Sequence, residues 1–134
     1  QVLRSTASQL YSVLLTAIGS PRFRCRLDLE PVAYQRARLS GTWMHTPPKY
    51  KAAKKLLSEQ FRLAYSSSPL TGRLVVELEF GSSDFRARDI DNLEKMILDS
   101  GNMIIYKDDS QVDQVVKTRL QGVERTVEVS VWEI

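Results

Sequence analysis

The chain has 134 residues, enough for one domain, and carries 19 basic and 16 acidic side chains for a formal net charge of +3 at pH 7. Hydrophobic residues make up 43% of the chain and charged residues 26%, and this ordinary globular composition argues against a disordered or low-complexity protein. Cys25 is the only cysteine, no apolar run approaches the roughly 20 residues of a membrane span, and no signal-peptide pattern is found. We therefore expect a cytoplasmic protein with no membrane partner.

The first third of the chain predicts a helix followed by a strand. Apolar residues at helical spacing, ended by Gly19 and Pro21, predict a helix over residues 5–18. Residues 22–30 alternate between apolar and charged side chains, which is typical of a strand with one buried face. Residues 36–45 are expected to form a second strand or an extended loop.

The middle of the chain predicts two further helices on either side of a strand. A helix over residues 49–66 is expected to bury a stripe of apolar residues, namely Tyr50, Ala53, Leu56, Leu57, Phe61 and Ala64. Residues 74–80 alternate between apolar and other side chains, which predicts a strand. A helix over residues 91–100 follows, with Asp91 as its N-cap and Glu94 at the capping-box position.

The last two apolar runs, residues 111–120 and 125–132, predict a hairpin that turns at Gln121-Gly122. The predicted order is thus helix, strand, optional strand, helix, strand, helix, strand, strand. This order predicts an α/β (α+β) fold in which helices pack on a mixed β-sheet. We expect an accessory helix within residues 1–20 and the main domain in residues 21–134.

Acidic residues gather between residues 84 and 112, although the whole chain is basic; they are Asp84, Asp89, Asp91, Glu94, Asp99, Asp108 and Asp109. If the chain approaches the third helix in an extended form, Asp89 and Asp91 point the same way. The helix carries the chain about 15 Å away, and an extended return from Met103 to Lys107 covers roughly 16 Å. Asp108 and Asp109 are then expected beside the first two aspartates.

Carboxylates that converge in this way need a cation or protons to offset their repulsion. Oxygen ligands suit Mg²⁺ or Mn²⁺, and the sequence has no His–Cys set for zinc. A calcium loop counted from Asp89 fails because Ser100 stands where a bidentate Glu is required. The spacing alone leaves alternatives open: Asp89 and Asp91 can be a helix cap and a solvated loop, and Lys95 can form surface ion pairs with acids four residues away or face a phosphate.

Two stretches, RARDIDNLEKMILDS and IYKDDSQV, resemble the RusA family of Holliday-junction resolvases. The family pattern is Asp-x-Asp-Asn-x-x-Lys followed by Asp-Asp-x-Gln-Val, and the upstream stretch PVAYQRARLSG is similar more loosely. The resemblance implies a homodimer that cuts four-way branched DNA with Mg²⁺, for which Mn²⁺ substitutes, and without a small-molecule cofactor. Carried over by position, it implies metal ligation by Asp89, Asp91 and Asp109, Asp108 as a secondary candidate ligand, and Lys95 as the catalytic lysine.

On this interpretation the enzyme makes paired symmetric nicks during DNA recombination or repair, in a bacterial or phage-infected cell. Four arginines are candidates for contacts to the DNA backbone: Arg36, Arg38, Arg86 and Arg88. Two alternatives remain open. One is a protein that binds branched DNA without cutting it, and the other is a nuclease that acts more broadly on flaps and forks.

Overall fold

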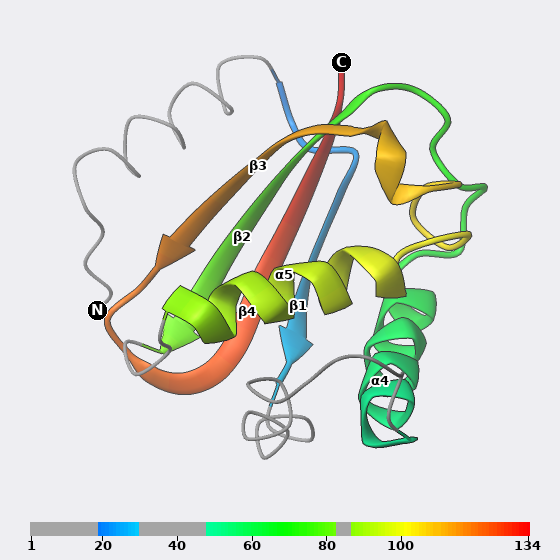
Figure 1. The fold of residues 1–134 in the computed structure, drawn as a ribbon. Coiled ribbons are helices and arrows are strands. Elements are labelled where there is room, and N and C mark those ends of the chain that lie inside the picture. Colours follow the sequence, from blue (N-terminus) through cyan, green and yellow to red (C-terminus); the bar gives the residue numbers. More distant parts are fainter. Residues whose placement is uncertain (1–18, 30–47, 83–86) are drawn as a thin grey trace.

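The computed structural model describes residues 19–29, 48–82 and 87–134. In this part of the chain a four-stranded sheet carries two helices on one face (Figure 1). The elements follow the predicted order: β1 (Phe23–Asp28), α4 (Pro48–Ala64), β2 (Leu74–Ser82), α5 (Ala87–Ser100), the 3-10 turn η1 (Asp109–Gln111), β3 (Val112–Arg119) and β4 (Val123–Glu133). The expected α+β fold is confirmed. The predicted helix over residues 5–18 and the segment 36–45 lie outside the described residues.

The strands are arranged in the order β1-β4-β2-β3. The strand β4 is antiparallel to both of its neighbours, and β3 is parallel to β2, with α5 as the connection between them. The predicted hairpin between the last two strands is therefore wrong, because β2 lies between β3 and β4. Alternation shows which face of a strand is buried but not which strand it pairs with, and β4 pairs along both of its edges.

The link from β3 to β4 crosses the end of β2 at very short range. The Leu120 amide donates to the Phe80 carbonyl oxygen over 2.8 Å. A Cβ atom added to Gly122 would lie 2.5 Å from the Gly81 carbonyl oxygen, closer than such atoms approach. A glycine is required at this crossing because any side chain would push the link away from the strand.

The main core lies between the sheet and the two helices. The helix α4 contributes Ala53, Leu57 and Phe61, each at most 2% exposed, and packs against α5 and β1. The predicted stripe on this helix is too wide, since Leu56 and Ala64 are exposed. A helix that contacts its neighbours along one side buries only the residues nearest that line, whatever the hydrophobicity of the flanking positions.

The other face of the sheet holds a smaller cluster of Val75, Val116 and Trp132. The buried carboxylate residues Glu77 and Glu79 alternate with core residues of β2 and so share this face. The Trp132 indole N–H donates to the Gly19 carbonyl oxygen over 3.0 Å, which ties the segment before β1 to the same face. Within the described ranges, the helices are too short or too polar to cross a membrane.

Candidate functional site

The first acidic pair lies inside α5 and not before it. The helix begins at Ala87, so Asp89 is in its first turn and Asp91 lies further along the helix. The prediction of Asp91 as N-cap and Glu94 as capping-box residue is therefore wrong. Two residues two positions apart on a helix are separated by about 200° around its axis, so they face different ways. Accordingly, Asp89 is 2% exposed, whereas the side chain of Asp91 is 70% exposed.

The first turn is a favourable place for the Asp89 side chain, because the partial positive charge of the helix N-terminus offsets part of the cost of burying a carboxyl group. Asp91 lies beyond the first turn and instead forms an ion pair with a lysine of the sheet. The Lys117 ammonium of β3 lies 2.8 Å from Asp91 Oδ1 and 2.8 Å from Glu94 Oε1. Hydrogen bonds first to Asp91 and then to Glu94 raise the pKa of Lys117.

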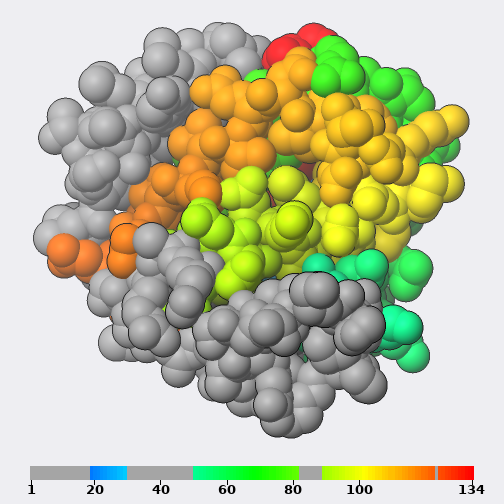
Figure 2. All heavy atoms as spheres, viewed as in Figure 1, coloured from blue at the N-terminus to red at the C-terminus, as the bar shows by residue number. Residues whose placement is uncertain are grey.

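Lys117 was not among the predicted site residues, because its contact depends on how β3 is placed. Lys117 is opposite Leu78 of β2 in the parallel register and shares the face of the sheet that α5 covers. Figure 2 shows α5 and β3 side by side on one surface of the molecule. The available signal was the alternation of Val115, Lys117 and Arg119 with Val116 and Thr118, which puts a lysine on the helix side of the strand.

The predicted lysine on α5 behaves differently. Lys95 is exposed, and among the described residues Asp91 forms its ion pair with Lys117 and not with Lys95. The open alternative of a surface pair between Asp91 and Lys95 is thus not found there. The role of Lys95 toward a phosphate remains a prediction.

The second acidic pair lies at the other end of α5. Asp109 lies beside Asp99 and Asn102, and its pKa is raised by burial, by its hydrogen bond and charge interaction with Asp99, and by the charge of Asp108. A hydrogen bond from the Asn102 side chain opposes this rise. Asp91 and Asp99 are eight residues apart in the helix, so about 12 Å of helix axis separates the two acidic pairs.

The segment after α5 explains this separation, because it is compact and not extended. The amides of Ile104 and Ile105 both donate to the Gly101 carbonyl oxygen, and the Met103 amide donates to Tyr106. Met103 adopts a positive φ of 66°, as a tight turn requires. The predicted extended return, and with it the convergence of Asp109 on Asp89 and Asp91, is wrong for a single chain.

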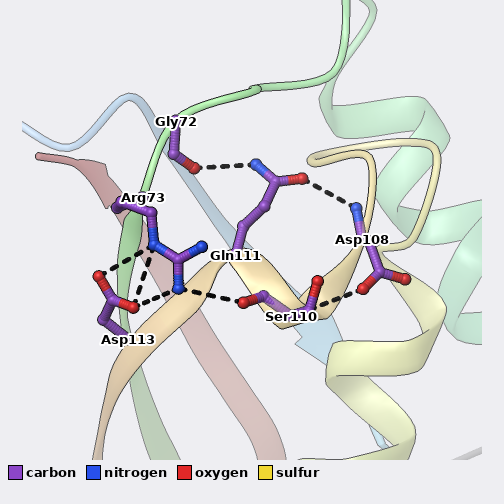
Figure 3. Close-up of polar contacts among 6 residues, drawn as sticks. All are labelled: Gly72, Arg73, Asp108, Ser110, Gln111 and Asp113. Carbon is purple, nitrogen blue, oxygen red and sulfur yellow. Dashed lines mark hydrogen bonds and ion pairs between the residues drawn. The ribbon is translucent and has the colours of Figure 1, made fainter.

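A hydrogen-bond network fixes the turn that carries Asp109 (Figure 3). The Gln111 side-chain amide donates to the carbonyl oxygens of Leu70 and Gly72, both over 2.9 Å, and its Oε1 accepts from the Asp108 amide over 2.9 Å. The Asp108 carboxylate in turn accepts from the Ser110 amide over 2.9 Å. A hydrogen bond with the Ser110 side chain, and then the bond with its amide, lower the pKa of Asp108. Asp108 is therefore the cap of η1, and Gln111 ties the turn to the chain before β2.

A second set of contacts strengthens the same region. Arg73, directly before β2, forms an ion pair with Asp113 of β3 and also donates to the Ser110 carbonyl oxygen over 3.2 Å. Figure 3 shows these contacts on the side of η1 next to those of Gln111. Together they hold Asp109 at a fixed place relative to the sheet.

Asp89, Asp91 and Asp109 are not gathered into one group in the described part of the chain. In residues 19–29, 48–82 and 87–134, no three or more His, Cys, Asp or Glu side chains are grouped closely enough to hold a metal ion. Of the candidate DNA contacts, Arg36, Arg38 and Arg86 lie outside the described residues, and Arg88 is placed in α5 by its backbone only. Their predicted roles are not tested by the geometry.

Comparison with known families decides which protein class this is. The family model described as endodeoxyribonuclease RusA matches residues 28–132. The chain belongs to the RusA family. The match spans both acidic motifs and every described strand and helix from α4 onward, so the resemblance seen in the sequence is confirmed. No curated protein shows a significant match. RusA-family membership makes the protein an endodeoxyribonuclease of the Holliday-junction-resolving kind.

Proposed function

We propose that this RusA-family protein is a Mg²⁺-dependent resolvase that cuts four-way DNA junctions by paired symmetric nicks and acts as a homodimer. The observation that carries the proposal is the family match over residues 28–132, which includes the Asp-x-Asp-Asn-x-x-Lys and Asp-Asp-x-Gln-Val motifs. A two-fold axis in the dimer would present two equivalent sites to opposing strands of a symmetric junction. Host or phage DNA as substrate would place the enzyme in the cytoplasm.

The proposed catalytic residues are Asp89, Asp91, Lys95 and Asp109, with Asp108 as a secondary candidate. The motif, and not the geometry of one chain, supports the assignment of the aspartates to the metal. These residues differ in their surroundings. Asp91 presents an exposed carboxylate beside Lys117, whereas Asp108 is already engaged as the cap of η1. Asp108 is therefore the weakest member of the proposed set.

The exposed Lys95 and the basic charge of the chain support a phosphodiesterase. Lys95 is an exposed cation on α5 and is free to turn toward a phosphate oxygen, where it would offset the charge that develops during cleavage. A divalent ion would supply the activated water. The basic balance of the chain favours binding of the DNA backbone, which is a sequence-independent contact.

The proposal is tested by incubating the protein with a labelled four-way junction, a linear duplex and a flap, with and without Mg²⁺. Symmetric nicks in the junction alone, and only with the ion, support it. Binding without cutting, even in Mn²⁺, would leave a branched-DNA-binding protein. Equal cutting of the flap would identify a nuclease of broader substrate range. Sedimentation equilibrium of the same sample gives the oligomeric state.

A single substitution tests the proposed site. We expect Asp91→Asn to abolish cleavage and to keep junction binding, because it removes a reacting carboxylate without removing a cation that contacts DNA. The matched control is Glu59→Gln, an exposed glutamate of α4. It should cut like the wild type. Full activity of Asp91→Asn in a gel assay would remove Asp91 from the mechanism.

A further inference from the structure

The contact between β3 and α5 joins one proposed catalytic carboxylate to the sheet. Lys117 Nζ lies 2.8 Å from Asp91 Oδ1 and 2.8 Å from Glu94 Oε1, so one ammonium is shared by two carboxylates on neighbouring turns of the helix. The ammonium has three N–H groups, and these two contacts use two of them. Its position is set by the sheet, since Lys117 belongs to the parallel register between β2 and β3.

The exposure of the partners shows what this contact does. The side chain of Asp91 is 70% exposed, and that of Lys117 is 34% exposed. Ion pairs this open to water add little to stability, because water screens them and ordering the side chains is costly. Their effect on geometry is larger. An unpaired aspartate on a helix surface samples several rotamers, whereas a carboxylate bonded to a fixed ammonium is held in one.

We propose that Lys117 is a positioning residue that holds the Asp91 carboxylate in the orientation used for junction cleavage. The inference deepens the proposed function and rests on it. Lys117 reaches Asp91 from the sheet, whereas Lys95 makes no ion pair with Asp91 in the described residues. We therefore assign the two lysines different roles. Lys95 faces outward, and Lys117 faces the helix.

The test compares Lys117→Met with Lys117→Arg over a range of junction concentrations at saturating Mg²⁺. Methionine keeps most of the length of the side chain and removes the charge, and we expect kcat to fall about 10- to 100-fold, as misplacing a catalytic group does. KM for the junction should change little, because DNA contacts are not altered. Arginine keeps a donor that reaches Asp91 and should restore most of the lost kcat.

Two controls separate positioning from a general structural effect. Lys107→Met removes an exposed lysine after α5 and should cut like the wild type. Glu94→Gln removes the other carboxylate from the ammonium while leaving the contact with Asp91, and should keep most of kcat. Equal losses of kcat in Glu94→Gln and Lys117→Met would show that the lysine merely anchors the helix, and would overturn the inference.

The remaining outcomes are distinguishable from failure of the proposed function. Wild-type kcat in Lys117→Met, or a loss confined to KM, overturns the role of Lys117 while the resolvase assignment stands. A wild-type protein that cuts no branched DNA overturns the assignment itself. Urea unfolding of Asp91→Asn, Lys117→Met and the double variant tests the contact without any cleavage: non-additive effects support it, and strictly additive effects count against it.

Discussion

Replacing Gln111 tests how the turn before β3 is held. The side chain makes three hydrogen bonds of 2.9 Å: it donates to the carbonyl oxygens of Leu70 and Gly72, and it accepts from the Asp108 amide. Glutamate has the same shape and can still accept from the amide. It cannot donate to the two carbonyl groups, and at neutral pH it places a negative charge beside both oxygens. The substitution therefore removes the two donors and adds a negative charge, and it leaves the shape of the side chain unchanged.

The expected cost follows from these contacts. A typical intramolecular hydrogen bond contributes about 1 kcal/mol net, so the loss of two such bonds costs about 2 kcal/mol. Repulsion between the carboxylate and two carbonyl oxygens in this part-buried place adds to that loss, and we expect a total of roughly 2–4 kcal/mol. Gln111→Ala loses all three bonds but lets water reach the carbonyl groups, so it should cost about 1–3 kcal/mol. Either loss is a large part of the stability of a domain this size.

The assay is urea unfolding followed by circular dichroism, with the midpoint and the slope fitted separately. The matched control is Lys107→Ala, since Lys107 lies just before the same turn, its side chain is exposed, and the structure engages it through its amide group, which alanine keeps. A stability of Gln111→Glu within about 0.5 kcal/mol of the wild type, the range of ordinary surface substitutions, would refute the reasoning. A control that is as destabilised as Gln111→Glu would show that the turn tolerates no change, whatever the chemistry.

Two further predictions concern the core. Leu57→Ala removes a fully buried side chain of α4 and should cost about 2–5 kcal/mol, whereas Leu63→Ala on the same helix, 91% exposed, should leave the urea midpoint nearly unchanged; similar losses in both would contradict the packing of α4. Burial, with a smaller contribution from the charge of Glu128, raises the pKa of the Cys25 thiol to about 12. Iodoacetamide should therefore modify the folded protein far more slowly at pH 8 than the urea-unfolded one. The protonated thiol favours the folded state. This contribution to stability is fully present below about pH 9 and is lost as the pH rises toward about 12. Rapid alkylation of the native protein at pH 8 would refute the burial of Cys25.

The fold was largely predictable because its main signal is local. The alternation in residues 22–30 and 74–80 gave β1 and β2 within a few residues, and the apolar spacing gave α4. The pairing of the strands was not local. Two apolar runs joined by a short glycine turn are typical of a hairpin, yet β4 pairs with β1 and β2, and β3 is at the edge of the sheet. Sequence periodicity records burial and carries no information about such partners.

The motifs supplied candidate site residues but not their arrangement in space. The start of α5 was placed at Asp91 because aspartate is a good cap, whereas the helix begins at Ala87 and turns Asp89 and Asp91 to different faces. The return after α5 was treated as extended, whereas hydrogen bonds to Gly101 fold it into a compact turn. Lys117 was missed because the partner of a lysine 26 positions from Asp91 is set by tertiary structure.

The place of β4 in the sheet has a consequence for how the protein is made. β1 and β2 have no contact along their edges in this sheet, since β4 fills the space between them and pairs with both. While the ribosome has synthesised only the chain up to β3, β2 and β3 can pair around α5, but β1 has no strand to join. The sheet is completed by its last strand, so we expect a growing chain to depend on late, long-range pairing and to expose apolar edges until β4 emerges.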